Sequence, residues 1–263
     1  MAADAIDRHV QEITLLGYTV VRGVVDSAGL PRWRDRIDAV IGRQVEEAGG
    51  VDRVKELDDA NTARAILAYD RSFIDLVVHP AVLAICERLL GDYFILTHHN
   101  ALSNPPDATG HYQMAYHRDL PFQHFVTSRP ISLSALFCVD EFSGETGATV
   151  VLPGSHKVEP FPDDEVVGAN ERQVAAVAGS YIVMDSMLYH RAAANRSSRP
   201  RRAINHIYAL PFLKQQIVLP SAIGGDFAGD PFLARLLGYE SDPPRNVAEW
   251  RTRRARRLRI GDA

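Results

Sequence analysis

The sequence has little cysteine and no long apolar run. Only two of its 263 residues are cysteines, Cys86 and Cys138, and each lies in an apolar stretch. We expect both to be buried, reduced thiols, which excludes a disulfide scaffold and a cysteine-rich zinc module. No segment approaches the roughly 20 apolar residues of a membrane span, and the first residues lack the apolar core of a signal peptide. These absences predict a cytoplasmic protein without a membrane partner.

An excess of charge of one sign is also absent. The chain carries 29 basic and 33 acidic side chains, which gives a formal net charge of -4. This balance gives no electrostatic reason to expect nucleic acid as a partner. The arginine-rich end, WRTRRARRLRIGDA, is interpreted as a solvated helix face rather than a site for an acidic partner. The expected partner is a small-molecule substrate, and no feature predicts an oligomeric state.

The N-terminal third, residues 1–92, is predicted to be helical apart from one opening strand at 17–25. Asp26 and Ser27 can cap a helix whose apolar residues recur at three- and four-residue steps up to Gly49-Gly50. A second helical stretch is expected over about 61–91. Pro80 should interrupt that stretch and begin a new helix.

From about residue 93 to residue 215 the chain changes to short β-type runs. Clusters of Gly, Pro, Asn and Asp separate these runs, as in antiparallel sandwiches and barrels. Residues 104–112 are expected to form a mobile loop, and 216–263 a helical extension. No repeat and no long linker marks a boundary. We therefore expect one domain over 1–263, with a mainly β core and bracing α-helices.

The segment QMAYHRDLPFQHF places His117 and Asp119 two residues apart. At the end of a strand, residues i and i+2 point to the same side. An imidazole and a carboxylate placed in this way can occupy two adjacent positions around a metal ion. A surface pair is the alternative for so short a pattern.

A second histidine, His190, ends the apolar run GSYIVMDSMLYH, 73 residues after His117. Two histidines and one carboxylate on one face of an octahedron are the ligands of non-haem Fe(II) oxygenases, with the other positions open. The alternative for His190 is a buried histidine that donates to a backbone carbonyl.

Two adjacent arginines, Arg201 and Arg202, follow eleven and twelve residues after His190. If the open metal positions bind a dicarboxylate such as 2-oxoglutarate, its distal carboxylate needs a partner, and the planar guanidinium pairs with both carboxylate oxygens. Adjacent strand residues point to opposite faces, so only one of the two can serve. The residues alone leave surface arginine as the alternative for either.

Five segments in order resemble the phytanoyl-CoA dioxygenase (PhyH-like) family of Fe(II)/2-oxoglutarate-dependent oxygenases. These are the opening GYTVVRGVVDSAGL (17–30), HRD (117–119), the turn GETGATVVLPGSHK (144–157), His190, and NRSSRPRRA (195–203). The resemblance implies a double-stranded β-helix core, a jelly roll of the cupin kind, braced by N-terminal helices. It also implies that Fe(II), 2-oxoglutarate and O2 are used to oxidise an unactivated carbon of a small organic substrate, with release of succinate and CO2.

The resemblance assigns His117, Asp119 and His190 as iron ligands and catalytic residues, and Arg201 as the partner of the 2-oxoglutarate carboxylate. Gln113 corresponds to a family glutamine that contacts 2-oxoglutarate, although it would share the ligand face only on a regular strand. The small hydroxyl side chains of Thr149 and Ser134 can also donate to 2-oxoglutarate, or can simply be satisfied polar groups. The resemblance makes His156 a turn residue, outside the metal site. The candidate substrate-facing residues near the ligands are Tyr116, Leu120, Phe122, His124, His98 and Asn100.

Alternation along the strands limits further candidates. His98 and His99 are adjacent, so they should point to opposite faces and do not form a metal pair. His206 shares parity with Arg202, so it should face away from the site if Arg201 faces into it. If Asp119 proves not to be a ligand, Asp185 is the substitute carboxylate.

Two other functions compete with the dioxygenase prediction. One is a zinc- or manganese-dependent hydrolase or isomerase on a cupin-like barrel, which would need neither Arg201 nor an oxoacid. The other is a non-catalytic small-molecule-binding barrel, for which the loss of a ligand would be the usual mark. A halogenase is disfavoured because Asp119 fills the position that a halide would need.

Overall fold

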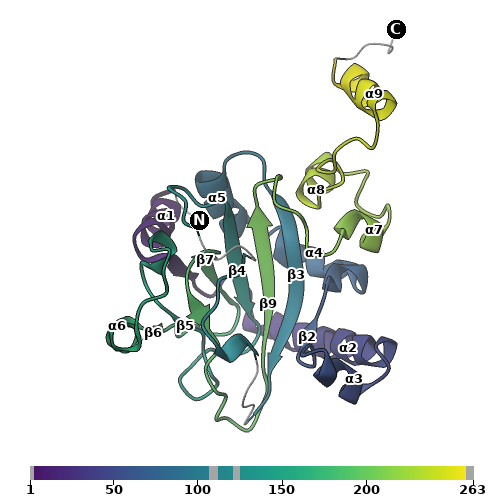
Figure 1. The fold of residues 1–263 in the computed structure, drawn as a ribbon. Coiled ribbons are helices and arrows are strands. Elements are labelled where there is room, and N and C mark those ends of the chain that lie inside the picture. The colour runs from purple at the N-terminus through teal and green to yellow at the C-terminus, as the bar shows by residue number, and fades with distance from the viewer. Residues whose placement is uncertain (1–2, 107–111, 121–124, 259–263) are drawn as a thin grey trace.

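Two antiparallel sheets that face each other form the centre of the protein, and helices cover the outer face of the larger sheet (Figure 1). The structure is a computed structural model that describes residues 3–106, 112–120 and 125–258. The helices are α1 (Ala3–Leu16), α2 (Leu30–Glu47), α3 (Val51–Glu56), α4 (Ile74–Val77), α5 (Pro80–Leu90), α6 (Asp164–Asn170), α7 (Leu219–Ile223), α8 (Pro231–Leu236) and α9 (Val247–Arg257). The strands are β1 (Tyr18–Val21), β2 (Thr62–Ala63), β3 (Ile95–Asn104), β4 (Ser132–Cys138), β5 (Val150–Val151), β6 (Arg172–Gln173), β7 (Ser180–Asp185), β8 (His190–Arg191) and β9 (Arg201–Ala209).

The larger sheet has the strand order β1-β7-β4-β9-β3-β2, and the smaller sheet has the order β6-β5-β8. All the strand pairs in both sheets are antiparallel, and neighbours in the sheet are often distant in sequence. Two isolated antiparallel bridges lie outside these strand pairs, one between His117 and His190 and one between Phe142 and Ala176. The predicted mainly β core with bracing helices is confirmed.

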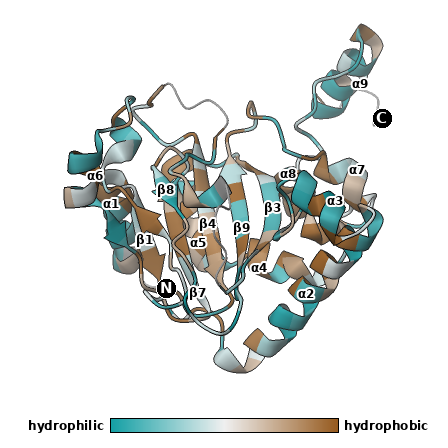
Figure 2. Cartoon of the chain, turned by 60° about the horizontal axis from the view of Figure 1, so that its bottom comes forward, coloured by the Kyte–Doolittle hydropathy of each residue, from teal (hydrophilic) through white to brown (hydrophobic). Residues whose placement is uncertain are grey.

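Strands β4 and β7 of the larger sheet bury apolar side chains on both faces because both faces are covered. On β4 and β7, Phe137 and Tyr181 point into the core beneath the helices, whereas Leu136 and Ile182 point into the core between the sheets. Figure 2 shows the resulting hydropathy, with hydrophobic residues along β4 and both kinds of residue along α2. Two-sided burial fixes the register of each strand, since a one-residue slip would exchange the two cores.

The N-terminal elements partly follow the prediction. Asp26 accepts a hydrogen bond from the N–H of Ala28 and caps a short 3-10 turn, after which α2 begins. Pro80 begins α5, as predicted. The prediction of continuous helix from residue 61 is wrong, because Thr62–Ala63 pairs with the end of β3 and short 3-10 turns follow.

The C-terminal residues are helical in α7, α8 and α9, as predicted. Helix α9 projects from the rest of the molecule (Figure 1), has no buried residue and carries the arginines. Most of the segment predicted to be a mobile loop, residues 107–111, lies outside the residues that the structure describes. In the parts of the chain that are described, no helix is long and apolar enough to span a membrane.

Two histidines lie in the apolar core beneath the helices. His99 and His206 pair across β3 and β9, with ring centroids 4.9 Å apart, and both are essentially fully buried. Burial lowers the pKa of His206 to about 4, although its Nδ1 contacts the carbonyl of Ala135 at 3.1 Å. The folded protein therefore keeps His206 neutral where an unfolded chain would bind a proton.

His206 should make the protein sensitive to acid. Its folded pKa is depressed, so stability falls as the pH drops from the unfolded value near 6.5 towards 4. We predict that His206→Phe, which keeps an aromatic ring, removes about 1.5 kcal/mol of the loss in unfolding free energy between pH 6.5 and pH 5. Denaturant titrations of the metal-free protein across this range measure the difference. An unchanged pH slope in the variant would contradict the prediction.

Candidate active site

A pair of backbone hydrogen bonds brings His117 and His190 together. The N–H of His117 donates to the carbonyl of His190, and the N–H of His190 donates to the carbonyl of His117, each at 3.0 Å. Residues that are directly paired in this way place their side chains on the same face. The two imidazole centroids are accordingly 4.4 Å apart, although 73 residues separate the histidines in sequence.

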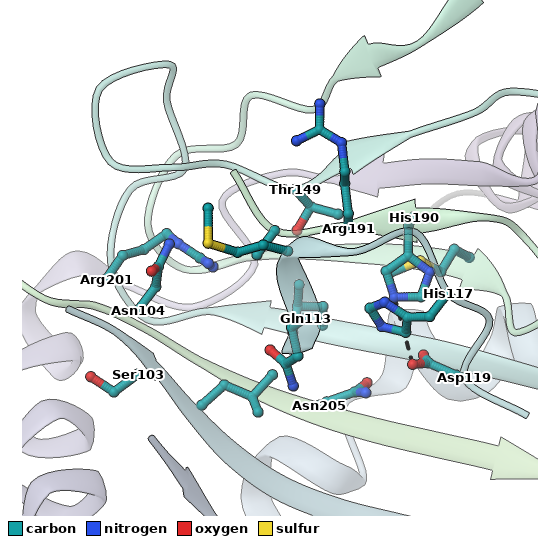
Figure 3. A pocket seen from close by; sticks show the side chains of 15 residues that line it. Ser103, Asn104, Gln113, His117, Asp119, Thr149, His190, Arg191, Arg201 and Asn205 are labelled. Carbon is teal, nitrogen blue, oxygen red and sulfur yellow. Dashed lines mark ion pairs between the residues drawn. The ribbon is translucent and has the colours of Figure 1, made fainter. Parts of the chain in front are cut away.

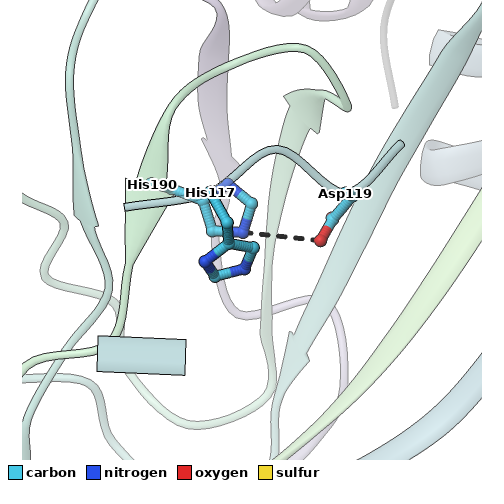
Figure 4. Close-up of side chains that lie close together, drawn as sticks. All are labelled: His117, Asp119 and His190. Carbon is cyan, nitrogen blue, oxygen red and sulfur yellow. Dashed lines mark ion pairs between the residues drawn. The ribbon is translucent and has the colours of Figure 1, made fainter. Parts of the chain in front are cut away.

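Asp119 completes the group, two residues beyond His117. Its N–H donates to the carbonyl of Ser186 at 3.0 Å, and its Oδ1 lies 3.6 Å from Nε2 of His190. One possible ligand atom from each of the three residues lies within 4.8 Å of the other two (Figure 4). Over the described ranges this is the only such group of three or more His, Cys, Asp or Glu residues.

Each imidazole is oriented by a carbonyl two residues earlier in the chain. Nδ1 of His117 lies 2.9 Å from the carbonyl oxygen of Ala115, and Nδ1 of His190 lies 3.0 Å from that of Leu188. A carbonyl only accepts hydrogen bonds, so each Nδ1 carries the proton and each Nε2 keeps its lone pair. This is the usual support of a metal-binding histidine.

Electrostatics favours the forms that bind a cation. Burial opposes the ionisation of Asp119, but the histidines His190 and His117 and a hydrogen bond from Ser134 outweigh it, so the pKa of Asp119 is lowered. Burial, and then the nearby charge of His190, lowers the pKa of His117. Metal ligands must be deprotonated, and these shifts keep a carboxylate and a neutral imidazole available.

Ser134 does not occupy the position predicted for it. Its hydroxyl donates to Oδ2 of Asp119 and contacts the hydroxyl of Ser186 at 2.9 Å, and it does not line the cavity beside the ligands. The prediction that Ser134 donates to 2-oxoglutarate is therefore corrected, because its single hydroxyl hydrogen is already donated to Asp119.

A cavity opens beside the three candidate ligands, between the two sheets (Figure 3). Arg201, at the start of β9, lines it and is 7% exposed. Its guanidinium carbon lies 4.1 Å from the ring centroid of Phe142, and its Nε has no hydrogen-bond partner in the part of the chain that the structure describes. Burial lowers the pKa of Arg201 to about 10, so the side chain stays a cation at neutral pH.

Arg202 points to the other face of the sheet. Its Nε lies 2.7 Å from Asp38 of α2, and its Nη1 lies 3.2 Å from Asp140. His206, which has the same parity, also faces away from the cavity. The alternation predicted for β9 is thus present in the structure.

Gln113 and Thr149 also line the cavity. Gln113 lies in a 3-10 turn rather than on a regular strand, and its backbone carbonyl accepts a hydrogen bond from the N–H of Ala192. The turn brings its side chain towards the middle of the cavity, between the ligands and Arg201 (Figure 3). Thr149 is buried and immediately precedes β5.

Two residues predicted to face the substrate are instead held by other parts of the protein. Tyr116 donates its hydroxyl to Glu171 at 2.7 Å, because strand alternation turns it away from His117. The amide of Asn100 accepts a hydrogen bond from the N–H of Ala65 at 3.1 Å and donates one to Gln216 at 2.9 Å. Neither side chain lines the cavity, so both predictions are corrected.

Of the other four residues predicted to face the substrate, the structure describes two. His98 is half-buried, on the same face of β3 as the cavity residue Leu102, and burial lowers its pKa although the charge of Asp119 opposes this. Leu120 is buried and does not line the cavity. The predictions for Phe122 and His124 fall outside the described residues.

Asp185 and His156 lie on the α1 side of the larger sheet. His156 contacts the carbonyl of Thr14 through Nε2 at 3.2 Å, and Asp185 accepts a hydrogen bond from the N–H of Met187. Burial raises the pKa of Asp185 to about 6. Neither residue belongs to the candidate ligand group, so Asp185 is not a substitute for Asp119.

Two features of the site were not predicted from the sequence. The turn that begins at Asp185 supplies the carbonyl of Ser186 to Asp119 and the carbonyl of Leu188 to His190, and no sequence pattern indicated this. Asn205 lines the cavity as well. Its parity with Arg201 on β9 was a signal that could have identified it.

Comparison with known proteins places the chain in a family. The family model "Phytanoyl-CoA dioxygenase (PhyH)" matches residues 15–203. The "Uncharacterized protein Rv1501" of Mycobacterium tuberculosis is 35% identical over 224 residues, which are 84% of this chain and 81% of that protein. The "Dioxygenase af480" of Aspergillus fumigatus is 29% identical over 179 residues, which are 63% of this chain and 55% of that protein.

Two solved structures share the fold. The non-heme alpha ketoglutarate dependent carbocyclase SnoK from nogalamycin biosynthesis superposes with a TM-score of 0.59 at 18% identity, covering 80% of this chain and 85% of its own. The corresponding epimerase SnoN gives a TM-score of 0.60 at 19% identity, covering 93% and 95%. These similarities confirm the predicted double-stranded β-helix. Because the family model spans well over half of its length, the chain belongs to the phytanoyl-CoA dioxygenase family and is an oxidoreductase of the dioxygenase class.

Proposed function

We propose that this protein is an Fe(II)- and 2-oxoglutarate-dependent dioxygenase that oxidises an unactivated carbon of a small organic substrate and releases succinate and CO2. One observation carries the proposal. The group His117, Asp119 and His190 opens onto a cavity that also contains Arg201, a buried cation whose Nε has no partner among the described residues. A metal-chelating acid with a second carboxylate fits both parts of this cavity.

The three candidate ligands suit iron. Two oriented imidazoles and one carboxylate on the same side of a site are the donor set of non-haem Fe(II) enzymes, and they leave coordination positions for an oxoacid and O2. Iron bound there would supply the activation of O2. The chain's own contribution is to fix the ligands: Ser134 holds the carboxylate of Asp119, and backbone carbonyls hold both imidazoles.

Arg201 suits the distal carboxylate of 2-oxoglutarate. No ion pair joins Arg201 to an acidic side chain in the described ranges. A buried cation without such a pair is costly, and an incoming carboxylate would satisfy it with two charge-assisted hydrogen bonds. The ring of Phe142 holds the guanidinium in place, and Thr149 adds a hydroxyl to the same cavity. A zinc or manganese hydrolase would have no use for Arg201, and a non-catalytic barrel would not need the complete ligand group.

The comparisons bear on the type of oxidation. The named activities of the two solved structures, a carbocyclase and an epimerase, both depend on alpha ketoglutarate. We propose that the same division applies here: the ligand group and Arg201 serve the common oxidant, and the substrate decides the outcome. Hydroxylation, desaturation, epoxidation and ring formation all fall within the proposal.

Anaerobic titration tests the proposed function directly. Adding 2-oxoglutarate to the Fe(II)-loaded protein should produce a weak visible charge-transfer band, which the zinc-loaded protein cannot give. Incubation with candidate metabolites, Fe(II), 2-oxoglutarate and O2 should then yield products changed in mass by about +16 or -2. A protein that loads Fe(II) but gives no band with 2-oxoglutarate would refute the assignment.

Loss of either histidine ligand should empty the metal site. We predict that His117→Ala and His190→Ala each weaken Fe(II) or Co(II) binding by at least about 100-fold, because even the supporting groups of a metal site are commonly worth 10- to 100-fold. Both variants should lose 2-oxoglutarate turnover and keep the wild-type circular dichroism spectrum. Metal titration and succinate formation measure the two effects. His9→Ala, which changes a histidine on α1 outside the site, is the control and should bind metal normally.

The role of Asp119 as a ligand can be tested by a substitution that frees its coordination position on the metal. We predict that Asp119→Gly lowers 2-oxoglutarate turnover by orders of magnitude and lets azide or chloride bind the metal, since a coordination position becomes free. Absorption spectra of the Co(II)-loaded variant with and without azide would detect this binding. Near-normal turnover by Asp119→Gly would remove Asp119 from the ligand set.

Substitutions of the two adjacent arginines should have different effects on 2-oxoglutarate affinity. Truncating one partner of a buried charge pair commonly costs about 2–5 kcal/mol, so Arg201→Ala should weaken 2-oxoglutarate binding roughly 30-fold or more. Arg202→Ala should leave this affinity nearly unchanged, because Arg202 pairs with Asp38 and Asp140 on the other face. Succinate formation against 2-oxoglutarate concentration compares the variants. Equal small effects would argue against an oxoacid in the cavity.

A further inference from the structure

Asn205 lies on the inner face of β9, between the two ends of the cavity. It follows Arg201 by four residues and therefore faces the same side, two strand repeats of about 6.6 Å further along. On the neighbouring strand β4, Leu136 is its register partner, and Ser134 lies one repeat beyond Leu136. Ser134 holds Asp119, so Asn205 lies one strand repeat from the level of the residue that supports this ligand and two repeats from Arg201.

The side-chain amide of Asn205 is directed into the cavity. In Figure 3 it lies between Gln113 and Asp119. Its Oδ1 is buried and finds no hydrogen-bond partner within the described ranges. An orphaned polar atom of this kind costs free energy in the folded protein unless a ligand or water satisfies it.

The amide of Asn100, on the neighbouring strand, is hydrogen-bonded through both its oxygen and its nitrogen, in contrast to that of Asn205. Asn100 is the register partner of Asn205 on β3, and it lies on the same face of the same sheet. Its Oδ1 accepts from the N–H of Ala65 and its Nδ2 donates to Gln216, so the protein itself satisfies this amide. Oδ1 of the neighbouring Asn205 meets no such partner among the described residues, and Asn205 lines the cavity instead.

We propose that Asn205 is a binding residue for the oxoacid, and that its side-chain amide donates a hydrogen bond to the carboxylate at the metal-side end. This inference rests on the proposed function. The carboxylate and oxo oxygens at that end only accept hydrogen bonds, so the amide of Asn205 has to present its nitrogen, the donor, to them. A half-turn of the planar amide group exchanges its nitrogen and oxygen, and this puts Nδ2 where the unpartnered Oδ1 lies in the structure.

Asn205→Ala should weaken oxoacid binding without lowering the stability of the protein. Asn205→Ala should weaken 2-oxoglutarate binding to the Fe(II)-loaded protein about tenfold, as expected for one hydrogen bond to a charged group. The melting temperature of the metal-free variant should stay equal or rise, because a buried orphan is removed. Asn205→Asp should weaken binding by more than about 100-fold, since a second negative charge would face the carboxylate.

A shorter oxoacid shows at which end Asn205 acts. 2-Oxobutyrate keeps the carboxylate and oxo group of the metal-side end and lacks the distal carboxylate. We expect Asn205→Ala to weaken 2-oxobutyrate and 2-oxoglutarate by the same factor. Arg201→Ala should weaken 2-oxoglutarate alone. Anaerobic titration of the Fe(II)-loaded protein with each acid gives the dissociation constants.

Asn100→Ala is the matched control. It removes an amide at the same level of the sheet, so it should lower the melting temperature and leave the 2-oxoglutarate dissociation constant within about twofold. If the wild-type protein binds neither oxoacid, the proposed function fails. If the wild type binds and Asn205→Ala binds 2-oxoglutarate equally well, or loses affinity for 2-oxoglutarate but not for 2-oxobutyrate, the proposed function stands and the role of Asn205 is refuted.

Discussion

The reciprocal hydrogen bonds between the backbones of His117 and His190 are the interaction on which the site depends. They place two imidazoles from distant segments on one face, and Asp119 reaches the same face because it lies two residues further on. The other residues of the site are placed around this pair of histidines. The larger sheet contributes Ser134 to hold Asp119, and the start of β9 contributes Arg201 at the other end of the cavity.

Strand alternation made much of the site predictable from sequence. It separated Arg201 from Arg202, and it placed His98 and His99 on opposite faces, as the structure has them. It also explains why Tyr116 turns away from the cavity. Tyr116 was expected to line the cavity only because it is next to His117 in sequence. What alternation cannot supply is the partner that a side chain meets from another element.

The predictions that failed did so for that reason. The hydroxyl of Ser134 is taken by Asp119, and the amide of Asn100 is taken by Ala65 and a distant glutamine; neither partner is near in sequence. The helix expected from residue 61 failed in the same way, because Thr62 and Ala63 pair with the edge of a sheet formed by later strands. Local periodicity predicted α2 well, since its apolar stripe and its start are set by neighbouring residues.

The pairing of His117 with His190 also has a consequence for how the chain is held together. Under the proposed function, an ion bound by both imidazoles would act as a cross-link that closes a loop of 73 residues. Such a link restricts the unfolded chain far more than the folded one, because the unfolded ensemble loses the entropy of an open loop. The metal would then serve the architecture as well as the chemistry, because it would fasten the segment of His117 to β8 on the side of the smaller sheet, whose strands are only two residues long.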